Sequence, residues 1–526
     1  MKLLISASSL LLLTLNIHAE CQKWDMSLET EEHVIGQIVI NAQNVFNPEN
    51  DLENKSFHRV ANGIRIQTKK HVIERDLLFV VGDILDAKLL QETERILRAR
   101  PYIKDAKITP VSLCNDGVII SVVTKDNWTL QPGISYGFSG GRSKYSFELQ
   151  EKNLFGLGKS LEFKYKKGLV RTENSIEYYD PSLFGSSKTL LVGYQDNSDG
   201  NLKHFNLNEP FKSLNTPFSW EIDSLDWELV NPLYESGRKV DEIGQFIDKK
   251  TLRYGKLLSA NDDSYHRINF GYTSDKSTFF NSLDFPDTPL PENRLFEYPW
   301  VSYEYIDEEF IEKTNFKSMG RTEDIALGHH LFAQLGYDSQ QSNWHYDMRY
   351  SKGLLPNEKN LFKFNVYSNG ILNSDQNINT HTGLGIEWHH FQSPTKTFYA
   401  ATALDLGENL FAEKPQYLGS ETGLRGYPFR YLNGDNVWLT TLEQRYFYNW
   451  YPLRTFQFAS ALFFDAGRVW SDGTSGNTYS NVGIGFRLVP TRTSGGQVIH
   501  FDVAFPTESK PGLDSVQFQI RAKKSF

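Results

Sequence analysis

Cysteine is almost absent from this chain, which carries only Cys21 and Cys114 in 526 residues. Two cysteines make no plausible zinc site, because a structural zinc ion needs four ligands. In an oxidising compartment, an even number of cysteines forms one pair and leaves no stray thiol. We therefore expect a Cys21–Cys114 disulfide, with two independent reduced thiols as the alternative, since sequence alone does not give the geometry of a pair.

Long apolar runs and dense basic segments are also missing. No stretch after residue 20 offers about 18 consecutive apolar residues, so no membrane-spanning helix is expected there. The chain is mildly acidic, with a formal net charge of −9, and a nucleic-acid partner is not expected because such binders show a basic face. Methionine is scarce, with four residues, while 14% of residues are aromatic. That combination is unusual for a large soluble enzyme but is expected of a membrane barrel with aromatic girdles.

The N-terminus has the pattern of a secretory signal peptide. Lys2 precedes an apolar run over residues 3–15, and the small residue Ala19 closes the stretch. The run is shorter than the about 20 apolar residues that a membrane helix needs, which disfavours an uncleaved anchor. We expect cleavage after Ala19, giving a signal peptide over residues 1–19 and a short N-terminal segment over residues 20–33.

Residues 34–126 mix helix and strand signals and predict one small α+β domain. Residues 34–45 read as a strand, Thr68 is placed to cap a short helix, and Asp86 is placed to cap a second one. The expected buried side chains are Val72, Ile73 and Leu77 on the first helix and Leu89, Leu90, Thr93, Ile96 and Leu97 on the second. Two strands follow Pro101, over residues 102–112 and 118–125, joined by a turn at Asn115-Asp116-Gly117. The predicted order is β-α-α-β-β.

Everything after Trp128 reads as strand, turn, strand, with side chains that alternate at a period of two. The apolar positions include Tyr145, Phe147 and Leu149 early and Phe362, Phe364 and Val366 later. A soluble β-sandwich also alternates, but roughly 400 residues of such strands without covering helices suit a large closed barrel. Closure is required, because an open sheet edge in hydrocarbon would leave backbone groups unpaired. We expect an all-β transmembrane barrel over residues 127–526, antiparallel, with an even strand number of about 16 to 20.

Short sequence signatures occur in both parts of the chain. Those in the N-terminal domain are His71-Val72-Ile73-Glu74-Arg75-Asp76-Leu77-Leu78-Phe79, Gly82-Asp83 and Arg95-Ile96-Leu97-Arg98. Those in the barrel are Asn153-Leu154-Phe155-Gly156-Leu157-Gly158, Asp180-Pro181-Ser182-Leu183-Phe184, Leu424-Arg425-Gly426-Tyr427, Phe463-Phe464-Asp465-Ala466-Gly467 and Val482-Gly483-Ile484-Gly485-Phe486. Together they resemble the BamA/TamA and two-partner-secretion (surface antigen D15-type) superfamily of outer-membrane assembly and translocation barrels. The N-terminal domain resembles a single POTRA (polypeptide-transport-associated) module.

The most specific of these signatures is Leu424-Arg425-Gly426-Tyr427, which is similar to the family's (Val/Ile)-Arg-Gly-(Phe/Tyr), with Leu424 a mild departure. It lies in a long predicted loop over residues 406–436, which the resemblance implies is folded into the barrel lumen. An arginine can anchor such a loop, because its guanidinium binds a carboxylate through two parallel hydrogen bonds. An ordinary solvated loop arginine is the alternative.

The expected partners of Arg425 are the carboxylates of Glu443 and Asp465, on the next two strands. Alternation turns both inward, because their neighbours suit lipid. These neighbours are Trp438, Leu442, Tyr446 and Tyr448 on one strand and Phe456, Phe458, Leu462 and Phe464 on the other. The resemblance also implies these partners for the loop anchor formed by Leu424, Arg425, Gly426 and Tyr427.

The last predicted strand has the pattern of an outer-membrane targeting signal. Its outward positions are Val516, Phe518, Ile520, Ala522 and the terminal aromatic Phe526. Lys524 interrupts the alternation, although a lysine near the membrane surface can extend its ammonium to water. The resemblance implies that this signal directs the barrel to its membrane.

Two patterns that are typical of enzymes or metal sites are outweighed by their context. Gly133-Ile134-Ser135-Tyr136-Gly137 satisfies the nucleophile pattern of hydrolases, but that chemistry needs a strand-to-helix turn, and here it lies within an alternating strand. His329-His330 and His389-His390 lie on strand-like segments, where adjacent side chains face opposite ways and do not share a metal. No phosphate-binding loop or paired-carboxylate signature is found, so no cofactor and no metal are expected.

The resemblance implies an outer-membrane protein of a Gram-negative bacterium that inserts or translocates client polypeptides, with the POTRA domain in the periplasm. In that mechanism the POTRA domain receives the client, and the first and last barrel strands part as a gate. The implied partners are outer-membrane lipid, client polypeptides and periplasmic chaperones or accessory proteins. The alternatives are a passive pore or surface antigen on the same fold, a dedicated secretor of one partner protein, and a membrane-embedded hydrolase built on Ser135.

Overall fold

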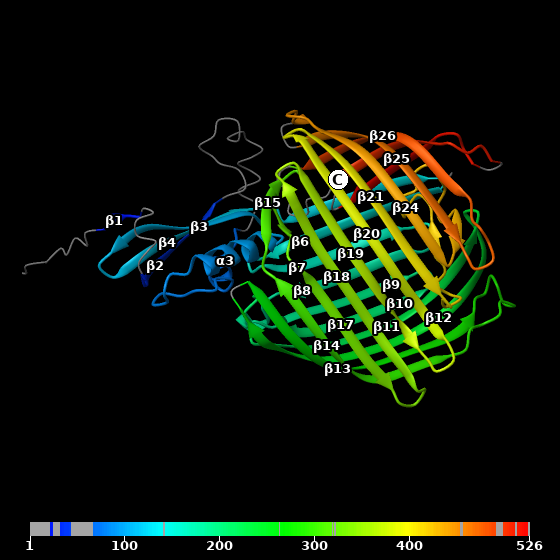
Figure 1. Ribbon diagram of the computed structural model, residues 1–526, viewed down its shortest axis with the longest axis horizontal. Coiled ribbons are helices and arrows are strands. Elements are labelled where there is room, and N and C mark those ends of the chain that lie inside the picture. The colour runs from blue at the N-terminus through cyan, green and yellow to red at the C-terminus, as the bar shows by residue number, and fades with distance from the viewer. Residues whose placement is uncertain are drawn as a thin grey trace, which may run out of the picture.

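The computed structural model describes residues 21–24, 32–43, 67–139, 142–261, 263–317, 319, 322–452, 456–490, 498–510 and 513–523. The expected signal peptide, Lys524 and Phe526 lie outside these residues. The described chain forms a small N-terminal domain followed by a large barrel (Figure 1). In this part of the chain, no α-helix has the length and apolar character needed to cross a bilayer.

The N-terminal domain is a four-stranded sheet with two helices. Its elements are β1 (Gln22–Lys23), β2 (Ile35–Gln43), α2 (Lys70–Glu74), α3 (Ala87–Ala99), β3 (Ile103–Cys114) and β4 (Gly117–Asp126), with the strand order β1-β3-β4-β2. From β2 to β4 this is the predicted β-α-α-β-β order. A disulfide joins Cys21 to Cys114 and so ties β1 to the end of β3. The core between sheet and helices includes Ile35, Val72, Ile73, Leu90, Leu97, Ile103, Ile120 and Val122.

The two helix starts differ from each other. Asp86 caps α3 as predicted, since its carboxylate accepts a hydrogen bond of 2.8 Å from the backbone N–H of Lys88. The predicted cap of α2 is wrong, because the residue before that helix, Lys69, makes no side-chain cap bond. The hydroxyl of Thr68 instead donates to Asp126 over 3.0 Å and accepts from Asn153 over 2.9 Å. Two partners remote in sequence therefore hold Thr68 at the junction between domain and barrel.

The barrel contains twenty strands in the described residues, each antiparallel to its neighbours, and β28 lies beside β5 to close the ring. They are β5 (Leu130–Ser139), β6 (Arg142–Leu154), β7 (Lys159–Lys167), β8 (Thr172–Asp180), β9 (Thr189–Asn197), β10 (Gly200–Glu209), β11 (Phe218–Glu235), β12 (Arg238–Ala260), β13 (Ser264–Asn281), β14 (Arg294–Asp307), β17 (His330–Asp338), β18 (Asn343–Asn357), β19 (Asn360–Leu372), β20 (Asn377–Ser393), β21 (Lys396–Glu408), β24 (Asn436–Phe447), β25 (Phe456–Trp470), β26 (Thr478–Pro490), β27 (Val498–Pro506) and β28 (Gln517–Lys523). The closed, even-numbered antiparallel barrel is confirmed, at the upper end of the predicted strand number.

The wall has an apolar outer face and a polar inner face, as the alternation predicts. On β26, Val482 and Phe486 are exposed, whereas Asn481 and Arg487 are buried on the other face. Because the ring is closed, each of its described strands has a hydrogen-bonded neighbour on both sides, as a sheet in hydrocarbon requires. The outer face therefore suits lipid, and the polar side chains line the lumen.

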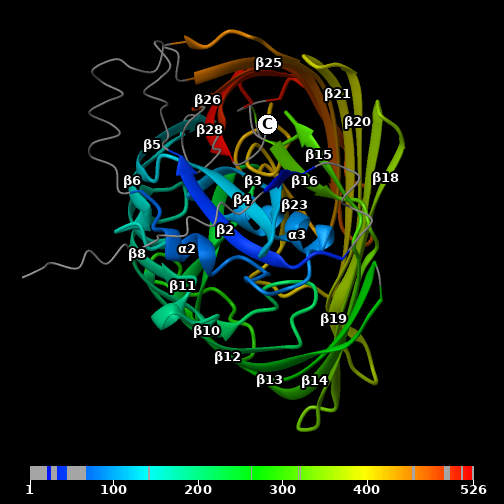
Figure 2. The ribbon, with the colours of Figure 1, turned by 90° about the vertical axis from the view of Figure 1, so that its left-hand side faces the viewer.

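Two hairpins enter the lumen from opposite ends. β22 (Gln416–Leu418) pairs with β23 (Leu432–Gly434) in the loop that joins β21 to β24. β15 (Phe310–Thr314) pairs with β16 (Thr322–Ala326) in the connection between β14 and β17. The strands alternate in direction from β5 onward. The connection between β14 and β17 therefore lies at the mouth that carries the N-terminal domain, and the loop between β21 and β24 lies at the far mouth. Figure 2, seen from the N-terminal domain, shows β15, β16 and β23 inside the ring.

Candidate functional site

The tip of the loop between β21 and β24 places Arg425 inside the barrel, against strands β24 to β26. Leu424 and Tyr427 are fully buried on either side of it and pack with Leu418, Val469 and Tyr479. Gly426 lies so close to β26 that a Cβ atom there would stand 2.6 Å from the Cβ of Asn481. Only glycine fits this approach, so the glycine of the signature sets how deep the loop sits.

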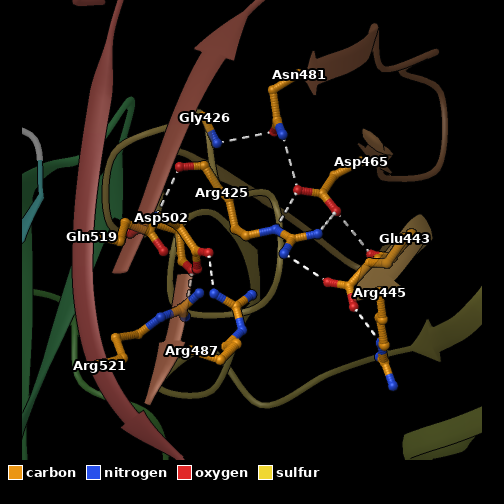
Figure 3. A network of polar contacts seen from close by, with 12 residues as sticks. Arg425, Gly426, Glu443, Arg445, Asp465, Asn481, Arg487, Asp502, Gln519 and Arg521 are labelled. Carbon is orange, nitrogen blue, oxygen red and sulfur yellow. Dashed lines mark hydrogen bonds and ion pairs between the residues drawn. The ribbon is translucent and has the colours of Figure 1, made fainter. Parts of the chain in front are cut away.

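Arg425 grips both carboxylates that the sequence offers as partners (Figure 3). Its Nε and Nη2 donate to Asp465 over 2.8 and 2.7 Å, which is the bidentate geometry expected of this pair. Its Nη1 donates to Glu443 over 2.7 Å. The guanidinium also lies 3.5 Å from the ring centre of Phe463, so one face of the cation contacts an aromatic ring.

Asp465 is completely buried and its hydrogen-bonding capacity is filled. Arg425 and the hydroxyl of Thr441 donate to Oδ1, the latter over 3.0 Å. Arg425 and the amide of Asn481 donate to Oδ2, the latter over 2.9 Å. A carboxylate has about four lone-pair sites, so each oxygen receives the two donors that it can accept. The burial of this charge is therefore compensated in full.

Glu443 is shared between two arginines. Its Oε1 accepts from Arg425, and its Oε2 accepts from Nε of Arg445 over 2.8 Å. Two cations and two carboxylates thus form one buried group whose formal charges cancel. Removing one member leaves the others unbalanced in a region from which water is largely excluded.

The same loop is hydrogen-bonded to the last barrel strand. Gln519 of β28 donates to the backbone carbonyl of Arg425 over 2.8 Å, and Arg521 of β28 donates to that of Ser420 over 2.8 Å. β28 is the strand that meets β5 where the ring closes. The loop that carries Arg425 therefore also holds one side of the closing seam.

The loop crosses the lumen to the opposite wall. Arg430 donates to the carbonyl of Pro232 on β11 over 3.1 Å, and the backbone N–H of Tyr234 donates to the hydroxyl of Tyr417 over 3.0 Å. In the ring of twenty, nine strands separate β11 from β25 in either direction. The loop is thus fastened to two diametrically opposed parts of the wall.

The hairpin β15–β16 packs into the lumen from the mouth that carries the N-terminal domain. Phe316, in its turn, packs with Ile325, Leu327 and Leu361 of β19. Met319 reaches the other side and packs with Phe447, Ala459, Ala461, Val489 and Val498 of β24 to β27. The hairpin is therefore held in the lumen by apolar contacts with distant strands.

Helix α3 of the N-terminal domain binds this hairpin through Arg98. Nη2 of Arg98 lies 2.7 Å from Asp324 of β16 and 3.0 Å from Glu312 of β15. Burial lowers the pKa of Arg98, but the hydrogen bond and charge of Asp324 outweigh it and raise the pKa above its ordinary value. Arg95 also pairs with Glu308 at the base of the hairpin. The domain, the hairpin and the lumen are thus one connected structure.

Sequence reasoning placed Arg425, Glu443 and Asp465 together, and the structure brings them into contact. It missed Asn481, Thr441, Gln519 and Arg521. A signal for Gln519 was present, because it alternates with the outward residues Phe518 and Ile520, and Val516 lies just before β28. Ser135 lies within β5 rather than at a strand-to-helix turn. The described residues hold no cluster of three or more His, Cys, Asp or Glu that could bind a metal.

Comparisons with known proteins give one family and several solved structures. A model described as the Omp85 superfamily domain matches residues 153–526. CdiB from Acinetobacter baumannii is similar with a TM-score of 0.43 and 12% identity, covering 96% of this chain and 78% of that one. The crystal structure of BamA from Haemophilus ducreyi lacking POTRA domains 1-3 has a TM-score of 0.38 and 12% identity, covering 92% and 84%. No curated protein matches the chain.

Proposed function

Since this chain belongs to the Omp85 superfamily of outer-membrane β-barrels, we propose that it inserts or translocates client polypeptides at the outer membrane. Its N-terminal domain serves as a POTRA-like module in the periplasm of a Gram-negative bacterium. The client is an outer-membrane or secreted polypeptide, and periplasmic chaperones or accessory proteins deliver it. No cofactor takes part in this mechanism.

The observation that carries the proposal is the loop that Arg425 holds across the lumen. Barrels of 16 to 18 strands leave an aqueous channel when nothing fills them, and this one has twenty in the described residues. Here a loop fastened to opposite walls and a hairpin packed in from the other mouth occupy the lumen. The filled lumen favours a route at the wall, where β28 and β5 meet.

The seam between β5 and β28 is the proposed gate. The loop is hydrogen-bonded to β28 through Gln519 and Arg521. If the loop moves, these hydrogen bonds break and β28 is held less firmly against β5. Once the two strands part, each presents unpaired backbone groups to which an extended client segment can add as a further strand. The client's own folding and burial of apolar surface then supply the driving force.

The N-terminal domain is placed to deliver such a segment. β2 stands at one edge of its sheet in the described residues, and an extended peptide can pair with an exposed edge. α3 contacts the hairpin at the same mouth of the barrel. We infer that a client bound at the domain and the state of the inner mouth are linked through Arg98.

Depletion of this protein, followed by a proteome of the outer membrane and the medium, tests the proposal. Loss of many barrels supports general assembly, and loss of one secreted protein supports the dedicated secretor. A proteome that does not change would overturn the proposal and favour the passive pore or surface antigen. We expect the proteome of the depleted strain to lack at least one outer-membrane or secreted client.

A further inference from the structure

A cavity of about 650 Å³ lies where helix α2 meets the first two inner turns of the barrel. Its lining includes His71, Glu74 and Arg75 from the N-terminal domain and Lys159, Tyr178 and Phe184 from the barrel. The backbone N–H of Lys69 donates to the carbonyl of Gly156 over 3.0 Å, which fixes α2 against the turn between β6 and β7. This cavity is separate from the Arg425 cluster and has no part in the proposed gate.

The cavity opens on the lipid-facing side of the wall. On the adjacent strands β7 and β8, Tyr178 lies opposite Leu161 and Ile176 lies opposite Phe163. Tyr178 and Ile176 are thus two residues apart on β8. Both Phe163 and Ile176 are exposed on the outer face, and side chains two apart on a strand share a face. Tyr178 therefore points outward at the rim, at the level where the headgroups of the adjacent leaflet lie.

The cavity contains a cation and an anion that lack ionic partners among the described residues. The guanidinium of Arg75 has five N–H donors, yet within the described part of the chain its one hydrogen bond is from Nη2 to the carbonyl of Leu157 over 3.5 Å, and its Nε is buried without a partner there. The carboxylate of Glu74, on the preceding residue, is exposed and forms no ion pair with another residue that the structure describes. Lys159, in contrast, is neutralised by Asp180 at 3.0 Å.

Two phenylalanines beside the cavity are exposed in a backbone conformation that disfavours them. Phe184 is 96% exposed with φ of 53°, and Phe155 is 62% exposed with φ of 56°. Each is the middle residue of a Leu-Phe-Gly turn at the same rim. A bulky residue at positive φ is strained, and such strain clusters at functional sites. Both rings are largely exposed, so lipid is the environment that makes use of both.

We propose that this cavity binds the phosphoethanolamine headgroup of a membrane phospholipid. The phosphate accepts hydrogen bonds from Arg75, and the ammonium donates to Glu74. The acyl chains follow the outer face at Tyr178, and Phe184 and Phe155 lie among the neighbouring lipids. The site goes beyond the proposed function. Its assignment to the inner leaflet rests on the proposed periplasmic position of the N-terminal domain. The cavity and its charges are observed independently of that position.

Native mass spectrometry of the purified full-length protein in detergent, with added phosphatidylethanolamine, tests the site. We expect Arg75→Gln to weaken lipid retention by roughly tenfold or more, because the charge-assisted hydrogen bonds to the phosphate are lost. Phe184→Asn should also weaken retention, although asparagine tolerates positive φ better and relieves strain. Arg238→Gln, on an exposed arginine at the far mouth, should leave retention unchanged. The heat-dependent gel shift verifies that each variant is folded.

Glu74→Gln separates the headgroup from a generic anion. It should weaken retention of phosphatidylethanolamine but not of phosphatidylglycerol, and inorganic phosphate at millimolar concentration should not displace the lipid. Equal retention by folded Arg75→Gln and wild-type protein, displacement by phosphate, or no effect of Glu74→Gln would each overturn the proposal. No client is present in this measurement, so its failure is distinguishable from failure of the proposed function.

Discussion

The charges around Arg425 are balanced inside the wall, and that balance has a measurable consequence at the scale of single residues. Arg425→Ala leaves Asp465 buried without its main partner and Glu443 with Arg445 alone, and breaking a buried pair costs about 3–5 kcal/mol. We predict that Arg425→Ala and Asp465→Ala each lower the temperature of the gel shift and the activity in a depletion strain. Because they share one interaction, the double variant should be little worse than either single one.

The matched control is Arg253→Ala, which removes another lumen arginine. Arg253 lies 2.8 Å from Glu221, but both side chains are partly exposed, and such a pair contributes about 0–1 kcal/mol. We expect this variant to keep nearly normal heat resistance. Full activity and unchanged heat resistance of Arg425→Ala at normal abundance would show that the loop anchor is not needed.

The disulfide gives a second prediction at this scale. A bond that closes a loop of about 100 residues stabilises a fold by about 4.7 kcal/mol in the chain-entropy model. Cys114→Ser should therefore lower the resistance of the N-terminal domain to proteolysis and leave the heat-dependent shift of the barrel intact. Thiol labelling of the denatured, unreduced wild-type protein should fail, and labelling of two thiols would refute the bond.

Some of these residues were within reach of sequence reasoning and others were not. Arg425, Glu443 and Asp465 were found because alternation sets the direction of a strand residue and the loop signature marks the arginine. Asn481 and Thr441 could not be predicted in this way. Each donates a hydrogen bond to Asp465, but in the sequence a neutral side chain in that role does not differ from other inward-facing polar residues. Thr68 was misassigned for a related reason, since its partners Asp126 and Asn153 are brought to it only by the tertiary fold.

At the scale of elements, the two hairpins that enter the lumen differ in how they are held. The loop between β21 and β24 is fixed mainly by charges and hydrogen bonds on β24 to β28. The hairpin β15–β16 is fixed inside by Phe316 and Met319 and outside by Arg98. It was not predicted, because its two five-residue strands alternate as the barrel strands do. The difference appears only in the pairing, because β15 and β16 pair with each other and the barrel strand β14 pairs with β17.

Helix α3 should therefore control the inner mouth. Arg98→Gln removes the ion pairs to Glu312 and Asp324 but leaves the apolar contacts of the hairpin, so we expect the barrel to stay folded. The predicted result is larger or more frequent channel openings of the purified protein in planar bilayers. Lys88→Gln is the control, because Lys88 is on the same helix and its pair with Asp263 is exposed. Equal conductance of the two variants would contradict the coupling.

At the scale of the whole molecule, the sequence predicted a closed antiparallel barrel. It predicted the number of strands only as a range of about 16 to 20, and the described residues contain twenty. Period-two alternation and the need to satisfy the backbone in hydrocarbon require a closed antiparallel ring. They do not say where one long strand ends, and β11 and β12 run for 18 and 23 residues. The joining of the N-terminal domain to the lumen depends on contacts such as Arg98 to Asp324, which no local pattern marks.

Opening of the seam between β5 and β28 is the central claim, and locking it is the most direct test. Tyr136 of β5 is exposed on the outer face, Ile520 of β28 shares that face by alternation with Gln519, and Gly137 lies against the Ile520 carbonyl. A Tyr136→Cys/Ile520→Cys pair, once its bond is verified by gel mobility, should hold the strands together. The control is Phe270→Cys/Val301→Cys, at paired positions of β13 and β14.

The measurement is rescue of client levels in a depletion strain by each pair, with and without a mild reductant. We predict that the oxidised seam pair fails to restore the client proteins, that reduction restores them, and that the control pair restores them in both conditions. Full rescue by the oxidised seam pair, with the cross-link shown to be complete, would contradict the account.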